Sequence, residues 1–196
     1  METADVVRNL LMYFLLPLWL AAGFADYLCH RAAHIERTSG WKESGLHLLQ
    51  FAEMAIAVLA ALLFEINAGV FLLMIVCLVL HEATAIWDVS YAVARRKVTA
   101  TEQHVHSFLE MLPLMGLLMV AALYWDQFIA LFGFGEPRFE LAMKPEPLPW
   151  LYVVVMLGLT LLFEVLPYVE ELLRGLRHRP CPASAHPHPG RAPRVR

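Results

Sequence analysis

The chain has few charged residues, few cysteines and no excess of basic residues. Charged residues make up 17% of its 196 residues, against about 25% in soluble proteins. The three cysteines are odd in number and far apart, which excludes a disulfide framework and a C-x-x-C metal site. A formal net charge of −3 provides no basic field for a nucleic acid. Hydrophobic residues make up 59% and the mean hydropathy is +0.57, which excludes a soluble globule and a disordered chain.

Long hydrophobic runs free of charge are also missing. The longest are 10–25, 66–81, 111–125 and 147–163, and each is shorter than the roughly 18 residues of a clear membrane span. With their flanking residues, however, five apolar segments reach the roughly 20 residues that cross a bilayer. These segments lie near 7–29, 46–66, 70–92, 104–132 and 148–172. The sequence therefore predicts an all-α integral membrane bundle of about five transmembrane helices.

Basic residues are distributed unevenly between the two sides of this bundle. Of the 15 Lys and Arg residues, 12 lie on the side reached at the end of the first segment and 3 on the other. Because cytoplasmic loops carry the excess of Lys and Arg, we expect the N-terminus outside and the C-terminus in the cytoplasm. We expect one transmembrane domain over 1–176 and a disordered tail, rich in Pro, Arg and His, over 177–196. The expected location is the bacterial inner (cytoplasmic) membrane.

Histidines and acidic residues gather at one depth of the first four segments. An ionisable residue inside a span costs roughly 2.5–3.5 kcal/mol on an insertion scale, so it indicates a function. Because successive helices alternate in direction, all four groups lie within about 15 Å of the cytoplasmic surface. The first four segments are thus expected to form a metal site. Its predicted ligands are Asp26, His30, His34, His47, Glu53, His81, Asp88, His104, His106 and Glu110.

The spacing of these residues supports a shared site. Asp26, His30 and His34 follow one another at intervals of four residues, which places them on one stripe of a helix. His106 and Glu110 are also four residues apart on the fourth segment. Such stripes allow one helix to present several ligands to the same centre.

Four further acidic residues have other expected roles. Glu82 and Glu164 are candidates for an acid, or for a group that holds a ligand in place. Glu43 and Glu102 lie at the entrances of spans, where the favoured interpretation is a solvated helix N-terminus stabilised by the helix dipole.

A site made of imidazoles and carboxylates suits iron, zinc or manganese. The number of ligands fits two transition-metal ions better than one, as in four-helix bundles with di-iron carboxylate centres. We therefore expect two ions, with iron as the first choice and the metal site facing the cytoplasm.

The His30-x3-His34 pair, the His-x-His at His104 and His106, and a histidine cluster on the cytoplasmic side resemble the membrane di-iron hydroxylase and desaturase group. That group includes fatty-acid hydroxylases, acyl desaturases and alkane monooxygenases. The resemblance covers 26–110, and the chain lacks the H-x-x-H-H boxes of the group and has more carboxylates. It implies oxidation of a hydrophobic or lipid-like substrate, with dioxygen as co-substrate. Because the chain has no flavin or nicotinamide motif, electrons are expected from a separate donor protein.

Three other functions stay open at this point. The same ligands could hold zinc in a membrane hydrolase of a lipid amide or ester. Two histidines from different spans, such as His47 with His81 or His106, could bind a b-type haem. Finally, intramembrane histidines and acids also occur in metal or proton transporters and in metal sensors. The apolar outer halves of the spans argue against transport.

Overall fold

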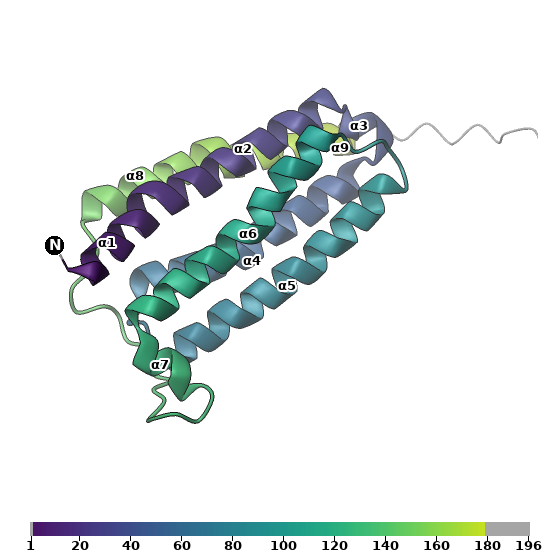
Figure 1. The fold of residues 1–196 in the computed structure, drawn as a ribbon. Coiled ribbons are helices and arrows are strands. Elements are labelled where there is room, and N and C mark those ends of the chain that lie inside the picture. Colours follow the sequence, from purple (N-terminus) through teal and green to yellow (C-terminus); the bar gives the residue numbers. More distant parts are fainter. Residues whose placement is uncertain (1, 179–196) are drawn as a thin grey trace, which may run out of the picture.

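The computed structural model describes residues 2–178, which form helices and loops with one isolated β-bridge (Figure 1). The described residues include five helices that are long and apolar enough to cross a membrane, which confirms the predicted all-α membrane bundle. The helical elements are α1 (Thr3–Leu10), η1 (Leu11–Leu15), α2 (Leu16–Ala32), α3 (Ile35–Thr38), α4 (Trp41–Leu63), α5 (Ala68–Val93), α6 (Ala100–Leu123), α7 (Trp125–Ala130), α8 (Trp150–Thr160), η2 (Leu161–Val165) and α9 (Leu166–Arg177). The predicted tail falls almost wholly on residues outside this range.

The first and fifth spans each contain a π-helical turn next to a proline. The first span joins α1, η1 and α2, and the fifth joins α8, η2 and α9. Pro17 and Pro167 follow the two π-helical turns. A proline ring clashes with the carbonyl four residues earlier, and an extra residue in the turn relieves that clash. The second of these turns contains Glu164, which is buried.

The fourth span is shorter than the sequence predicts, and the second begins earlier. The predicted segment 104–132 is divided at Tyr124, whose backbone angles (φ −128°, ψ 46°) end α6 before α7 begins. Helix α4 begins at Trp41 rather than near residue 46, directly after Gly40 with its positive φ of 72°. Asn67 is the N-cap of α5, and its side chain accepts a hydrogen bond from the Val70 amide at 3.1 Å.

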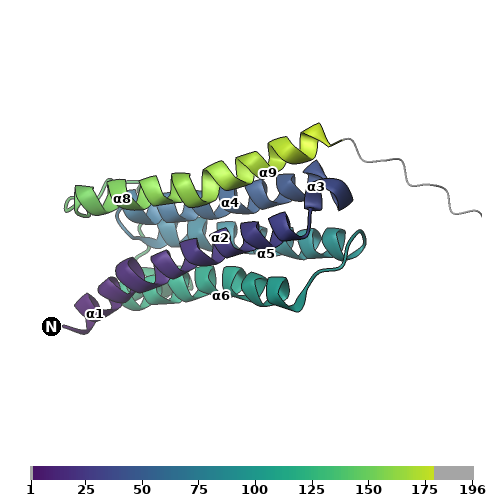
Figure 2. The ribbon, with the colours of Figure 1, turned by 90° about the horizontal axis from the view of Figure 1, so that it is seen from above.

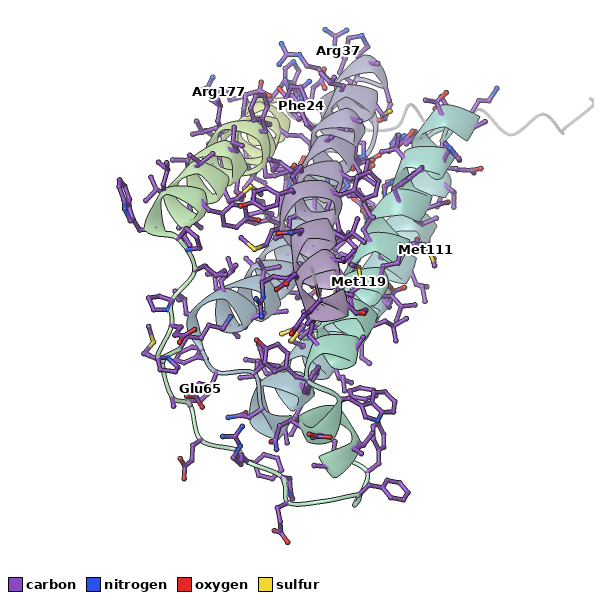
Figure 3. All side chains as sticks on the ribbon, turned by 60° about the vertical axis from the view of Figure 1, so that its left-hand side comes forward. Phe24, Arg37, Glu65, Met111, Met119 and Arg177 are labelled. Atoms are coloured by element: carbon purple, nitrogen blue, oxygen red, sulfur yellow. The ribbon has the colours of Figure 1, made fainter. Side chains whose placement is uncertain are left out.

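The long helices lie side by side, so that distant parts of the sequence become neighbours (Figures 1 and 2). Helix α4 packs against both α5 and α9, and α2 packs against α6. Figure 3 shows Arg37 and Arg177 at one end of the bundle and Glu65 at the other. We call the end with Arg37 and Arg177 the basic end.

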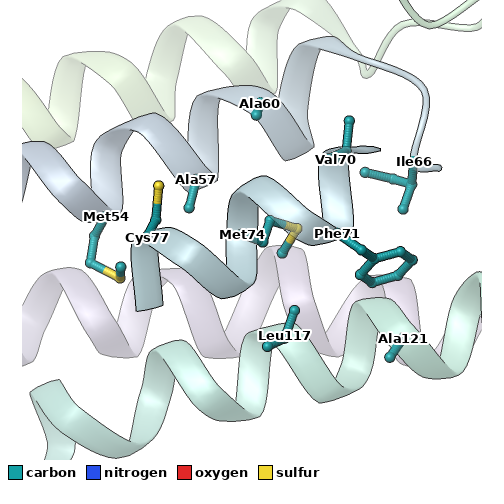
Figure 4. Close-up of a cluster of buried hydrophobic side chains, with 10 residues drawn as sticks. All are labelled: Met54, Ala57, Ala60, Ile66, Val70, Phe71, Met74, Cys77, Leu117 and Ala121. Atoms are coloured by element: carbon teal, nitrogen blue, oxygen red, sulfur yellow. The ribbon is translucent and has the colours of Figure 1, made fainter. Parts of the chain in front are cut away.

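The half of the bundle away from the basic end has an apolar core. Side chains from α4, α5 and α6 meet there, with Met74 of α5 between Ala57 of α4 and Leu117 of α6 (Figure 4). Many large apolar side chains also face outward, among them Ile86 (68% exposed) and Leu118 (55%). This exposed apolar surface suits a bundle surrounded by lipid.

Candidate metal centre

Three imidazoles and three carboxylates form a closed ring inside the bundle, in the half nearer the basic end. They alternate around the ring, and five helices supply them. The six residues are Asp26 and His30 (α2), His47 (α4), Asp88 (α5), His106 (α6) and Glu171 (α9). All are buried except His106, whose side chain is 14% exposed. We call these six residues the ring.

Two of the imidazoles each place both nitrogens against a carboxylate. His30 has Nε2 3.3 Å from Asp26 Oδ2 and Nδ1 3.2 Å from Glu171 Oε2. His47 has Nδ1 2.8 Å from Glu171 Oε1 and Nε2 3.2 Å from Asp88 Oδ2. Glu171 therefore joins the two imidazoles, one through each of its oxygens.

His106 closes the ring on the other side. Its Nδ1 lies 3.1 Å from Asp26 Oδ1 and its Nε2 lies 3.6 Å from Asp88 Oδ2. The rings of His30 and His47 are stacked, with centroids 4.1 Å apart and an angle of 12° between their planes. Asp26, His30 and His106 can each offer an atom to one ion, since these atoms all lie within 4.8 Å of one another.

A close approach of two helices brings the fifth span into the ring. A Cβ atom on Gly175 would lie 2.9 Å from both the nitrogen and the Cα of Trp41, so the glycine lets α9 pack on the first turn of α4. Glu171 lies one helical turn before Gly175, and this packing places it against His47.

A second buried group of charges lies beside the ring. Arg96, in the connection between α5 and α6, donates from Nε to both oxygens of Glu43 at 3.1 and 3.3 Å and from Nη1 to Glu102 at 3.0 Å. Burial alone would lower the pKa of Arg96, but its hydrogen bonds to Glu102 and Glu43 outweigh this and raise the pKa above its ordinary value. The guanidinium therefore stays charged. Glu102 also lies 3.7 Å from His30 Nε2, which connects the two groups.

The formal charges of the side chains in this region do not balance. The ring contains three carboxylates, and Glu43 and Glu102 add two more, against the single positive charge of Arg96. With neutral imidazoles, the formal charge of these residues is −4. Isolated buried charges are costly, so a site of this composition is expected to hold cations or protons.

Five of the predicted ligands come together in the ring: Asp26, His30, His47, Asp88 and His106. Two other predicted histidines lie apart from it. His34 sits in a left-handed turn (φ 51°) after α2, where the helix has ended, and its exposed side chain lies 3.4 Å from Glu36. His104 lies on the exposed side of α6 and packs edge-on against Phe108, because two residues of a helix turn the side chain by about 200° from His106.

Three acidic residues proposed from the sequence also lie outside the ring. Glu53 accepts a hydrogen bond from the Thr84 hydroxyl at 2.9 Å, which links α4 to α5. Glu82 and Glu110 are partly buried, and neither makes an ion pair or a side-chain hydrogen bond within the described part of the chain. His81 and Glu164 are buried near the ring without contacting it, and both line the cavity described below.

Some residues of this region were missed in the sequence. The interpretation of Glu43 and Glu102 as solvated residues is wrong, because their exposed fractions are 0% and 1%. The ring also includes the fifth span through Glu171, which lies seven residues after Glu164 and hence on the same helix face. Tyr168 of the same span donates its hydroxyl to Asp26 Oδ2 at 3.3 Å. The seven-residue spacing between Glu164 and Glu171 was the signal in the sequence that could have found Glu171.

An elongated cavity of about 420 Å³ begins at the ring and continues between the helices. Asp26, His47 and His106 line one end of it. The remainder is lined mainly by apolar side chains of α2, α4 and α8, such as Phe51 and Met156. The ring thus faces an apolar space rather than the aqueous side alone.

Neither a scan against models of known protein families nor searches of curated proteins and of solved structures find a match to this chain.

Proposed function

We propose that the protein is a membrane-embedded oxidoreductase with a dimetal centre, which uses dioxygen to oxidise a hydrophobic, lipid-like substrate. The observation that carries the proposal is the ring, in which three imidazoles and three carboxylates alternate in a buried site next to an apolar cavity. Alternation matters because it gives every imidazole nitrogen a carboxylate neighbour, and shared carboxylates are the usual bridges of dimetal sites.

The distances in the ring fit ligands of a shared ion. If two ligand atoms each lie about 2.1 Å from one ion and the ligand–ion–ligand angle is a right angle, the two ligand atoms are about 3 Å apart. The nitrogen-to-oxygen distances in the ring range from 2.8 to 3.6 Å, and because a neutral imidazole has one lone pair, one nitrogen of each histidine could bind an ion while the other donates to a carboxylate. Two divalent cations would also neutralise the formal charge of −4 worked out for this region. The charge favours two ions, and the distances allow ring members to share them.

The donor set suits iron, manganese or zinc, and iron is our first choice. Bound iron would supply the activation of dioxygen, and an external donor protein would supply the electrons. The chain's own residues bind the ions, exclude water and present the apolar cavity to a substrate. Tyr168 and Glu171 hold ring members in place, the tyrosine through Asp26 and the glutamate by joining His30 and His47.

We also propose that the basic end faces the cytoplasm. Of the described residues, helix ends and loops at that end carry 8 Lys and Arg residues, against 3 at the other end, and such an excess is retained on the cytoplasmic side. In this orientation the ring lies in the inner half of the membrane.

Metal analysis of the purified protein, with an optical spectrum, tests the proposal. We expect about two transition-metal equivalents per chain in the wild type, and strong depletion in His106→Ala. His104→Ala is the matched control, because it removes an exposed histidine from the same helix only two residues away. A folded, metal-free wild type, or equal metal content in both variants, would overturn the centre. Zinc alone, without iron, would favour the hydrolase instead.

A further inference from the structure

Besides Tyr168, whose hydroxyl is bonded to Asp26, three polar side chains that do not belong to the ring line the cavity close to it. They are Gln50, His81 and Glu164, from α4, α5 and η2. His81 and Glu164 are 6% and 7% exposed. Within residues 2–178, Oε1 of Glu164 and Nε2 of Gln50 lack a hydrogen-bond partner, and the two nitrogens of His81 face the backbone of Gln50 and Leu109 without good hydrogen-bond geometry. Buried polar atoms are normally satisfied, so these four atoms indicate a ligand that carries its own polar group.

The chemistry of these side chains defines the polar group. Gln50 Nε2 can only donate, a neutral imidazole donates from one nitrogen and accepts at the other, and Glu164 accepts or, when protonated, donates. Glu164 is an acid that makes no ion pair within the described residues, so an anionic group beside it would meet negative charge when Glu164 is ionised. A small uncharged group with one donor and one acceptor, such as a hydroxyl or a primary amide, fits best.

The rest of the cavity suits one long hydrocarbon chain. Its lining on α4 extends from His47 to Leu62, which is about 22 Å at 1.5 Å per residue. One leaflet of the hydrocarbon core is about 15 Å thick. The cavity is therefore long enough for a single extended acyl chain, and its 420 Å³ is in the range of ligand pockets.

A lateral opening would let such a chain enter from the lipid. Leu59, Leu157 and Leu161 line the cavity and are 40%, 46% and 52% exposed, so the cavity is not sealed at these side chains. An amphiphile could therefore move from the bilayer into the cavity without crossing water.

We infer that the cavity binds a single-chain lipid with an uncharged hydroxyl or amide head group, held by Gln50, His81 and Glu164 beside the ring. That this lipid is the substrate rests on the proposed function, whereas its binding in the cavity does not. The head group lies near the ring, so the first carbons of the chain are the ones presented for oxidation.

Photolabelling tests the inference in purified protein reconstituted in lipid nanodiscs. The probe is a long-chain primary alcohol with a diazirine in its chain, and labelled peptides are identified by mass spectrometry. We expect labels on residues that line the cavity of α4 and α8. Unlabelled hexadecanol should displace the probe, whereas hexadecane and palmitate should do so at least about tenfold less effectively, because they lack the head group or carry a charge.

Variants identify the residues that hold the head group. His81→Leu and Glu164→Leu should each weaken displacement by hexadecanol about three- to tenfold, the range for one lost hydrogen bond. Gly23→Ala tests Glu164 without removing a polar group, because a Cβ there would clash with Glu164 Oε2 and displace the carboxyl group. Glu53→Gln is the matched control, since Glu53 is an acid of α4 that does not line this cavity.

The outcomes separate the inference from the proposed function. Labels outside the cavity, equal displacement by hexadecane, or unchanged displacement in both leucine variants would overturn the head-group site. Metal content is measured on the same preparations. Specific labelling in a metal-free protein would refute the proposed function and leave the lipid site standing. Two metal equivalents without specific labelling would refute the lipid site and leave the proposed function standing.

Discussion

Removing the buried arginine beside the ring is the sharpest test of how the charges are held. In Arg96→Ala, Glu43 and Glu102 lose the guanidinium that they share, although their own exposed fractions are 0% and 1%. The side chain of Arg96 is itself only 4% exposed. The variant therefore leaves two buried carboxylates without their cation, and raises the formal negative charge of the region by one.

The expected loss of stability is large. Breaking a buried ion pair by removing one partner costs about 3–5 kcal/mol, because the other charge stays buried without compensation. Here one cation serves two carboxylates, so we expect the loss to reach at least the lower part of this range. Since folded domains are stable by only about 5–15 kcal/mol, Arg96→Ala should weaken the fold severely.

Equilibrium unfolding in mixed detergent micelles measures the effect. Arg95→Ala is the control, because Arg95 is exposed and stacks on Tyr91 of the preceding helix α5, 3.5 Å from its ring centre, and the variant should cost less than about 1 kcal/mol. Adding Glu43→Gln and Glu102→Gln to Arg96→Ala should restore much of the loss, because the amides carry no charge. If Arg96→Ala and Arg95→Ala unfold with the same free energy, the reasoning about buried charge is refuted.

Four other predictions use the same protein. Gly175→Ala should cost about 1–3 kcal/mol, as overpacking does, because the new methyl group meets the backbone of Trp41; unchanged unfolding would contradict the close approach. Asn67→Ala should cost more than the roughly 1 kcal/mol of a helix cap, because Nδ2 also donates to the Glu140 carbonyl at 2.6 Å, and Asn67→Asp, which keeps the acceptor for Val70 but loses this donor, should recover only part of the loss; full recovery in the Asp variant would contradict the bond to Glu140. His34→Gly should leave metal content unchanged and stability equal or slightly higher, since glycine adopts the left-handed turn freely; a loss of metal would make His34 a ligand. Stripping the metal with a chelator should lower the unfolding temperature, and adding the metal back should restore it; equal unfolding temperatures would mean that no cation belongs to the folded state.

Much of the candidate centre could be predicted from helix periodicity. Asp26 and His30 are four residues apart, and a helix of this length must place them on one face. The alternating direction of successive spans brought His47, Asp88 and His106 to the same depth. His34 was not predictable in this way, because the same spacing of four residues continued past the point where α2 ends. Local spacing indicates a shared face only as far as the helix continues.

Amino-acid composition and periodicity by themselves determined that the chain is an all-α membrane bundle, because burial of apolar segments in lipid is a property of each segment taken alone. They also determined most of the depth at which ionisable groups lie, because rise per residue is constant along a helix. Only the tertiary structure decided which groups meet. The docking of α9 on α4 through Gly175 brought Glu171 between two imidazoles, and the path of the α5–α6 connection buried Arg96 against Glu43 and Glu102. Such contacts depend on helix packing between residues up to 141 positions apart, which no local pattern encodes.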